Sequence, residues 1–95
     1  FEPRIEITID ERNHHSIVAI TTMDRPGLLY TIASTIADSG LQVSHAKITT
    51  LGERVEDIFY LVDEQHRQVQ DRSLLESLRT RLLKTLGEQQ HNPGD

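Results

Sequence analysis

The fold is decided by the stretch Ser16–Gly40, SIVAITTMDRPGLLYTIASTIADSG. It opens with the apolar run Ile17–Ile20, which is typical of a buried strand. Apolar residues then recur at the spacing of one helix face, at Leu28, Leu29, Ile32, Ala33, Ile36 and Ala37. The stretch therefore predicts a strand, a tight junction and a helix over about residues 26–39, with a left-handed C-cap at Gly40.

The junction between strand and helix has features of both a turn and a binding site. Asp24 is placed to cap the first free amides of the helix, and Pro26 suits its first turn, where no N–H partner is lost. Gly27 has no Cβ, so another molecule can approach the backbone closely. Converging N–H groups at the positive end of a helix dipole suit a carboxylate or a phosphate. The alternative is that Pro26 and Gly27 only make the turn.

Further strands are predicted on both sides of this unit. Arg4–Asp10 alternates apolar and polar residues, as in a half-buried edge strand, and a polar hairpin loop joins it to the strand at 16–22. The strand at 41–51 changes its apolar phase near Ser44–His45, which predicts a bulge. After a tight turn, residues 54–62 are rich in strand-forming side chains.

A second helix is predicted over about residues 73–86. Ser73 and Glu76 match a capping box, the leucines form one apolar stripe, and Gly87 is placed to end the helix. Residues 88–95 contain no apolar anchor, so we expect a disordered tail there and an ordered domain over residues 1–87.

Two helices with one apolar stripe each must bury those stripes on a sheet. We therefore expect an α+β sandwich, a four-stranded antiparallel sheet with both helices on one face, in ββαββα order. The helix crossover should join parallel neighbours or near-neighbours. The other sheet face would be open, which predicts pairing with another domain or another copy.

Composition excludes several classes of protein. The chain has 95 residues, a net charge of -5 and no cysteine, which argues against nucleic acid as a partner and excludes disulfides and thiol chemistry. Mean hydropathy is -0.45, and no apolar run approaches the roughly 20 residues of a membrane span. No signal-peptide pattern is seen, so we expect a cytoplasmic protein, and the absence of an initial Met suggests a piece of something longer.

Metal binding and catalysis have little support in the residues. The five histidines include no His-x-x-x-His spacing, and no cysteine assists them. No Ser/His/Asp set falls at recognisable strand ends, and there is no phosphate-binding loop of the GxxxxGK[ST] kind. We therefore predict no metal site and no catalytic residue in this chain.

Three motifs carry a family resemblance: DRPGLL at 24–29, GLQV at 40–43 and AKITTLGERVEDIFY at 46–60. Together they resemble an ACT domain, of the type found at the C-terminus of bacterial bifunctional uridylyltransferase/uridylyl-removing enzymes (GlnD). The resemblance implies a ferredoxin-like ACT sandwich. The usual ACT order is βαββαβ, but no strand follows the second helix here. The strand at 4–10 can take the missing edge beside 16–22, which gives a permuted order.

The resemblance also implies a ligand site. It would lie on the DRPGLL residues, Asp24, Arg25, Pro26, Gly27, Leu28 and Leu29, and be completed by Gln42, Val43 and Ser44 of a paired domain. The implied ligand is L-glutamine or another small amino acid. The backbone around Gly27 would meet its carboxylate or amino group, and Asp24 could accept hydrogen bonds from its ammonium or amide. We expect Arg25 to be exposed, where it meets a carboxylate or a partner, or is simply solvated.

Two functions from different classes remain open. In the first, the chain is a regulatory, amino-acid-sensing ACT module without its own enzyme activity or cofactor, which controls uridylylation of the nitrogen signal protein PII by a parent enzyme. The Mg²⁺ and UTP that the family implies would bind elsewhere in that parent. In the second, the chain is a docking module that pairs with another ACT domain or with PII without a small ligand, through sheet-face residues such as Val18 or Ile20.

Overall fold

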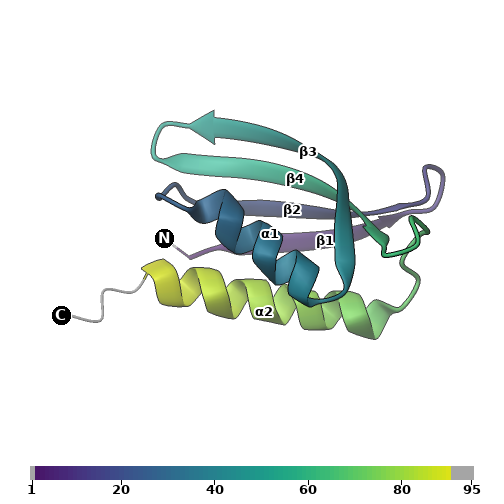
Figure 1. Ribbon diagram of the computed structural model, residues 1–95. Helices are drawn as coiled ribbons and strands as arrows, with labels where there is room; N and C mark the ends of the chain where they lie inside the picture. The colour runs from purple at the N-terminus through teal and green to yellow at the C-terminus, as the bar shows by residue number, and fades with distance from the viewer. Residues whose placement is uncertain (1, 91–95) are drawn as a thin grey trace.

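Figure 1 shows the computed structural model of the protein, which describes residues 2–90. Four strands form one sheet: β1 (Arg4–Asp10), β2 (His15–Met23), β3 (Leu41–Leu51) and β4 (Arg54–Asp63). Helices α1 (Leu28–Asp38) and α2 (Arg72–Gln90) lie on one side of it (Figure 1). The predicted α+β class and ββαββα order are confirmed.

The sheet has the strand order β1-β2-β4-β3, and all neighbours are antiparallel. β4 lies between β2 and β3, so α1 connects near-neighbours that run in the same direction. β1 pairs with β2 from Arg4↔Thr21 to Asp10↔His15, which confirms that it takes the edge left by the missing final strand.

Alternation along the central strands determines which side chains face the helices. In β2, Ser16, Val18, Ile20 and Thr22 are buried, whereas the residues between them are partly exposed. Val18 and Ile20 are therefore core residues, and the expectation that they form an open docking face is wrong. The helices contribute Leu28, Ile32 and Ile36 from α1 and Leu75, Leu78, Leu82 and Leu86 from α2 to the same core.

Strand β3 is an edge strand with unusually little cover. Its pairing with β4 shifts between Val43 and His45, which confirms the predicted bulge. After Leu41, nearly every residue of β3 is exposed on both faces. Figure 1 shows the reason, because the far end of β3 extends beyond the layer formed by the two helices.

Helix α1 starts later than predicted, and its cap is different. Gly27 is the N-cap in the left-handed region, with φ 76°, and no side chain caps the helix. The prediction that Asp24 is the cap is wrong because the Asp24 N–H donates to the Glu53 carbonyl at 2.7 Å, which extends the β2–β4 pairing by one residue. Pro26 consequently lies before the helix rather than in its first turn.

Helix α2 also differs at both ends. The Asp71 Oδ1 accepts from the backbone N–H groups of Ser73 at 3.0 Å and Leu74 at 3.2 Å, so Asp71 makes the capping contacts and the predicted Ser73 capping box is wrong. Gly87 does not end the helix, which continues to Gln90. The predicted disordered tail is therefore wrong for residues 88–90, and residues 91–95 lie outside the described part of the chain.

Candidate functional site

The junction of β2 and α1 places the DRPGLL residues at one end of the sheet, beside the start of β4. Met23 pairs with Arg54, and the Asp24–Glu53 backbone hydrogen bond fixes the position where the chain leaves the sheet. Asp24, Pro26 and Gly27 are all exposed. A Cβ added to Gly27 would meet nothing within 4 Å, so the space above this backbone is open.

The first turn of α1 presents amide groups to that open space. Thr31 N–H donates to the Gly27 carbonyl at 3.0 Å, and Leu28 N–H donates to the Arg25 carbonyl at 3.2 Å. The helix itself offers no acceptor to the N–H groups of Leu29 and Tyr30. No acidic residue occupies the first turn, so the positive end of the helix dipole has no carboxylate of its own there. This arrangement suits an anionic group.

The side chains of the junction are divided between core and surface. Leu28 is buried in the core and anchors the start of α1, which leaves only its backbone for a ligand. Leu29 and Tyr30 are 48% and 78% exposed. Their exposed side chains form an apolar surface beside the start of the helix. The sequence did not point to Tyr30 as part of this surface.

Arg25 lies differently from the exposed position expected. It is half-buried, and its Nη2 donates to the Leu86 carbonyl of α2 at 3.2 Å. Its Nε and Nη1 are buried without a hydrogen-bond partner, and burial lowers the pKa of the guanidinium. Arg25 therefore connects the junction to the C-terminal part of α2.

Gln42, Val43 and Ser44 are exposed on β3, but they lie far from the junction within one chain. Gln42 and Val43 pair with Val62 and Leu61 at the end of β4, whereas the junction lies beside Arg54 at its start. At about 3.3 Å per residue, the two groups are separated by roughly 23 Å along the strand. One chain therefore does not bring the two halves of the expected site together.

A carboxylate that the sequence analysis did not single out lies close to the junction. Asp57 on β4 is 1% exposed, and neither of its oxygens has a hydrogen-bond partner. Burial is the main cause that raises the pKa of Asp57. The backbone amide of Thr49 lowers this pKa, although its contact with the Asp57 carboxylate does not have the geometry of an ordinary hydrogen bond. The negative charge of Asp24 raises the pKa of Asp57. The alternation of Val55, Asp57, Phe59 and Leu61 was the available signal, since it places Asp57 in the core-facing phase.

An aromatic cluster lies on the opposite sheet face. The rings of His45 and Tyr60 stack with centroids 4.0 Å apart, and the His15 ring is edge-on to both. Within residues 2–90, no group of three or more His, Cys, Asp or Glu side chains is arranged to hold a metal ion.

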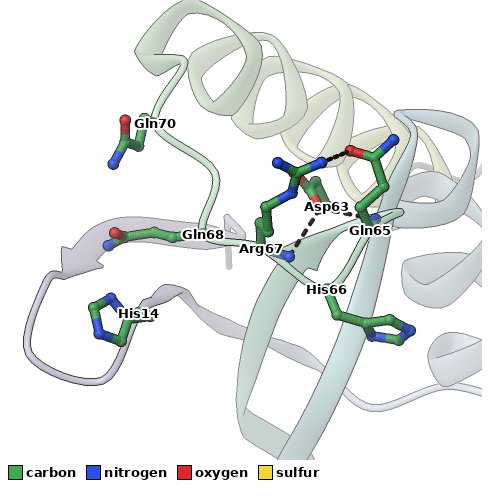
Figure 2. A pocket seen from close by; sticks show the side chains of 7 residues that line it. All are labelled: His14, Asp63, Gln65, His66, Arg67, Gln68 and Gln70. Atoms are coloured by element: carbon green, nitrogen blue, oxygen red, sulfur yellow. Dashed lines mark hydrogen bonds between the residues drawn. The ribbon is translucent and has the colours of Figure 1, made fainter.

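Figure 2 shows a polar hollow of about 750 Å³, lined by His14, Asp63, Gln65, His66, Arg67, Gln68 and Gln70. Asp63 Oδ1 accepts from the backbone N–H groups of Gln65 and Arg67, and the Arg67 guanidinium donates to the Gln65 side chain. These polar groups already satisfy one another. The hollow also lies at the end of β4 opposite the junction, so it is separate from the candidate site.

Comparison with known proteins identifies relatives over most of the chain. Residues 5–90 match the family model described as "ACR9-like, ACT-like domain". The bifunctional uridylyltransferase/uridylyl-removing enzyme of Pseudomonas aeruginosa strain LESB58 is 39% identical over 93% of this chain and 10% of that protein. The enzyme of the same name from Burkholderia orbicola strain MC0-3 is 43% identical over 88% of this chain and 9% of that protein.

This chain therefore spans about a tenth of the length of these relatives. No solved structure matches it. Among the described residues, no helix is both long and apolar enough to cross a membrane.

Proposed function

Because the chain belongs to the ACT-like domain family, we propose that its regulatory role is to sense an amino acid, with L-glutamine the first candidate. The observation that carries the proposal is the start of α1. There, Gly27 has a left-handed backbone with open space beside it, and it is followed by the first amides of the helix. No acidic side chain lies in the first turn to accept hydrogen bonds from those amides. The α-carboxylate of the ligand would accept hydrogen bonds from these amides.

The second half of the site would come from a second ACT domain, either another copy of this chain or a neighbouring one in a longer protein. The unpaired edge of β3 supports this pairing, since Val43, Ile48 and Leu51 expose apolar side chains beside free backbone groups. If two β3 strands pair antiparallel, residues 42–44 of one copy move toward the junction end of the other. Pairing would thus join the two groups that one chain keeps apart.

The names of the relatives support a wider role. We propose that the chain acts within, or together with, an enzyme that adds and removes uridylyl groups, and that ligand binding changes the balance of those activities on PII. Such control requires the ligand to bind two states with different affinity. The chemistry, with its Mg²⁺ and UTP, would belong to other segments, and the setting would be cytoplasmic.

Thermal unfolding tests the sensor proposal. We expect L-glutamine at millimolar concentration to raise the unfolding midpoint, with no rise for D-glutamine, because only the folded state binds the ligand. Gly27→Ala should abolish this rise. Gly52→Ala is the matched control, since Gly52 has a similar φ of 68° and equally open space but lies in the β3–β4 turn. A midpoint that no L-amino acid changes would overturn the proposal.

A docking module without a small ligand is the second candidate, and the exposed β3 edge is the observation that favours it. This function predicts association through β3 with no effect of any amino acid. Ile48→Lys should then abolish association, while Gly27→Ala should leave it unchanged.

A further inference from the structure

Strand β3 has one regular segment that is bounded on both sides. Its register with β4 shifts between Val43 and His45, and the turn to β4 begins at Gly52. Between these two points the segment His45–Leu51, the regular edge of β3, pairs with β4 without interruption. Among residues 2–90, β3 is the last strand of the sheet, so the other side of this segment points away from β4. The regular edge is therefore available to one further strand.

The centre of the regular edge is Ile48. If a second copy of the chain pairs antiparallel with the first over the whole regular edge, Ile48 lies opposite Ile48 of that copy. Opposed residues of an antiparallel pair share a face of the sheet, so the two-fold axis passes through a residue and not between two. An axis at any other residue would shorten the ladder or extend it into the register shift or the turn. The other opposed pairs in this arrangement are His45 with Leu51, Ala46 with Thr50 and Lys47 with Thr49.

The side chains of the regular edge favour the same axis. An axis at Lys47 would place two like charges directly opposite each other, which is destabilising. An axis at Thr49 would instead leave Ile48 opposite Thr50. With the axis at Ile48, a side chain that is 45% exposed packs against its own copy and is removed from water. Each Lys47 then lies opposite an uncharged threonine.

We propose that a second copy of this chain pairs with the first along the regular edge, with the two-fold axis at Ile48. The two sheets then continue as one, with the helices of both copies on the same side. This inference rests on the proposed function, which requires a second domain, and it commits to a copy of the same chain as that domain. An interface of this kind is isologous, because both copies contribute the same residues.

This register also determines what the second copy brings to the ligand site. His45 of the second copy lies opposite Leu51, with the two Cα atoms about 4.5–5.5 Å apart. Residues 42–44 of the second copy continue past Leu51 toward the β3–β4 turn. In that turn the Glu53 carbonyl accepts from the Asp24 N–H of the junction. The pairing thus places residues 42–44 of one copy beside the DRPGLL junction of the other.

Disulfide trapping of single-cysteine variants tests the register, because the chain has no cysteine of its own. Only a residue on the two-fold axis lies opposite itself. We expect oxidised Ile48→Cys to form linked dimers about 10-fold faster than Lys47→Cys or Thr49→Cys, since only position 48 lies within disulfide reach of its own copy. Lys47→Cys and Thr49→Cys are the matched controls, one residue to each side. Refolded together, these two variants should form a mixed dimer faster than either links to itself.

The outcomes separate the register from the sensor function. Light scattering of the wild-type protein needs no variant, and a monomeric wild type would overturn the proposal. Fastest linking at Lys47→Cys or Thr49→Cys would place the axis elsewhere and overturn it, and so would equal rates for all three variants in a protein whose wild type is paired. The effect of L-glutamine on the unfolding midpoint is measured separately. Its absence in a protein paired at Ile48 would remove the sensor function and leave the register standing.

Discussion

At the scale of single residues, the sequence was most informative where a backbone requirement coincides with a residue type. Gly40 could be placed just after the first helix because a left-handed position favours glycine, and it has φ 77°. Asp24 could not be assigned correctly, since its amide donates to the carbonyl of Glu53, just before β4 and 29 positions away in the chain. Asp57 was missed because its importance depends on lacking partners, which only the packed structure reveals.

The first prediction concerns the stability cost of Asp57. Its pKa is raised in the folded state, so the protonated form is favoured there, and its contribution to the free energy of unfolding is fully present below the ordinary Asp pKa of 3.8. This contribution is lost as the pH rises through the raised pKa. Asp57→Asn does not titrate and should therefore be more stable than the wild type at pH 7, by about 1–3 kcal/mol.

Urea unfolding of both proteins at several pH values measures this difference. We expect the gain from Asp57→Asn to shrink steadily as the pH is lowered toward 4. Glu56→Gln should show no comparable trend, because Glu56 is exposed. A stabilisation that is constant across this pH range would contradict a raised pKa at Asp57.

At the scale of elements, the alternating and helical apolar periodicities predicted all four strands and both helices. Outside β3, each apolar phase corresponds to a face that the fold buries. Helix ends were less predictable. Ser73 matched the pattern of a cap, but Asp71 lies two residues earlier and makes the contacts. The exposure of β3 was also not predictable, because it depends on how far the helices reach over the sheet.

The α2 start provides a test at this scale. Asp71→Ala should lower the thermal midpoint because two backbone N–H groups lose their acceptor. Ser73→Ala should lower it less, since the Ser73 hydroxyl only donates to Asp71. Circular dichroism during heating measures both. A larger loss for Ser73→Ala would support the capping box that we consider wrong.

The contact between Arg25 and Leu86 is a second element-scale prediction. Arg25→Met should retain much of the packing and remove the hydrogen bond to the α2 carbonyl, at a cost of about 1 kcal/mol. Hydrogen exchange should then become faster in the C-terminal part of α2 and remain unchanged at its start. Unchanged exchange throughout α2 would mean that Arg25 does not stabilise the helix.

At the scale of the whole molecule, the sequence predicted a sheet that pairs with a second domain, but it assigned the wrong residues to the surface. Within the sheet, the exposed large apolar residues lie on the β3 edge rather than on β2. Ile48→Lys should weaken self-association, because it places a charge on that edge. Thr8→Lys, at an exposed position on the other edge strand, is the control. Light scattering after gel filtration measures the mass of each variant in solution. If the wild type is paired and both variants show the same paired mass, the β3 edge is excluded as the pairing surface.

The central claim is that an amino acid binds at the start of α1, and amide NMR during a titration with L-glutamine tests it most directly. We predict the largest shifts at the N–H groups of Gly27, Leu29 and Tyr30, with little change around the polar hollow at Asp63–Gln70 in Figure 2. Shifts confined to that hollow, or no shifts at all in the folded protein, would contradict the claim.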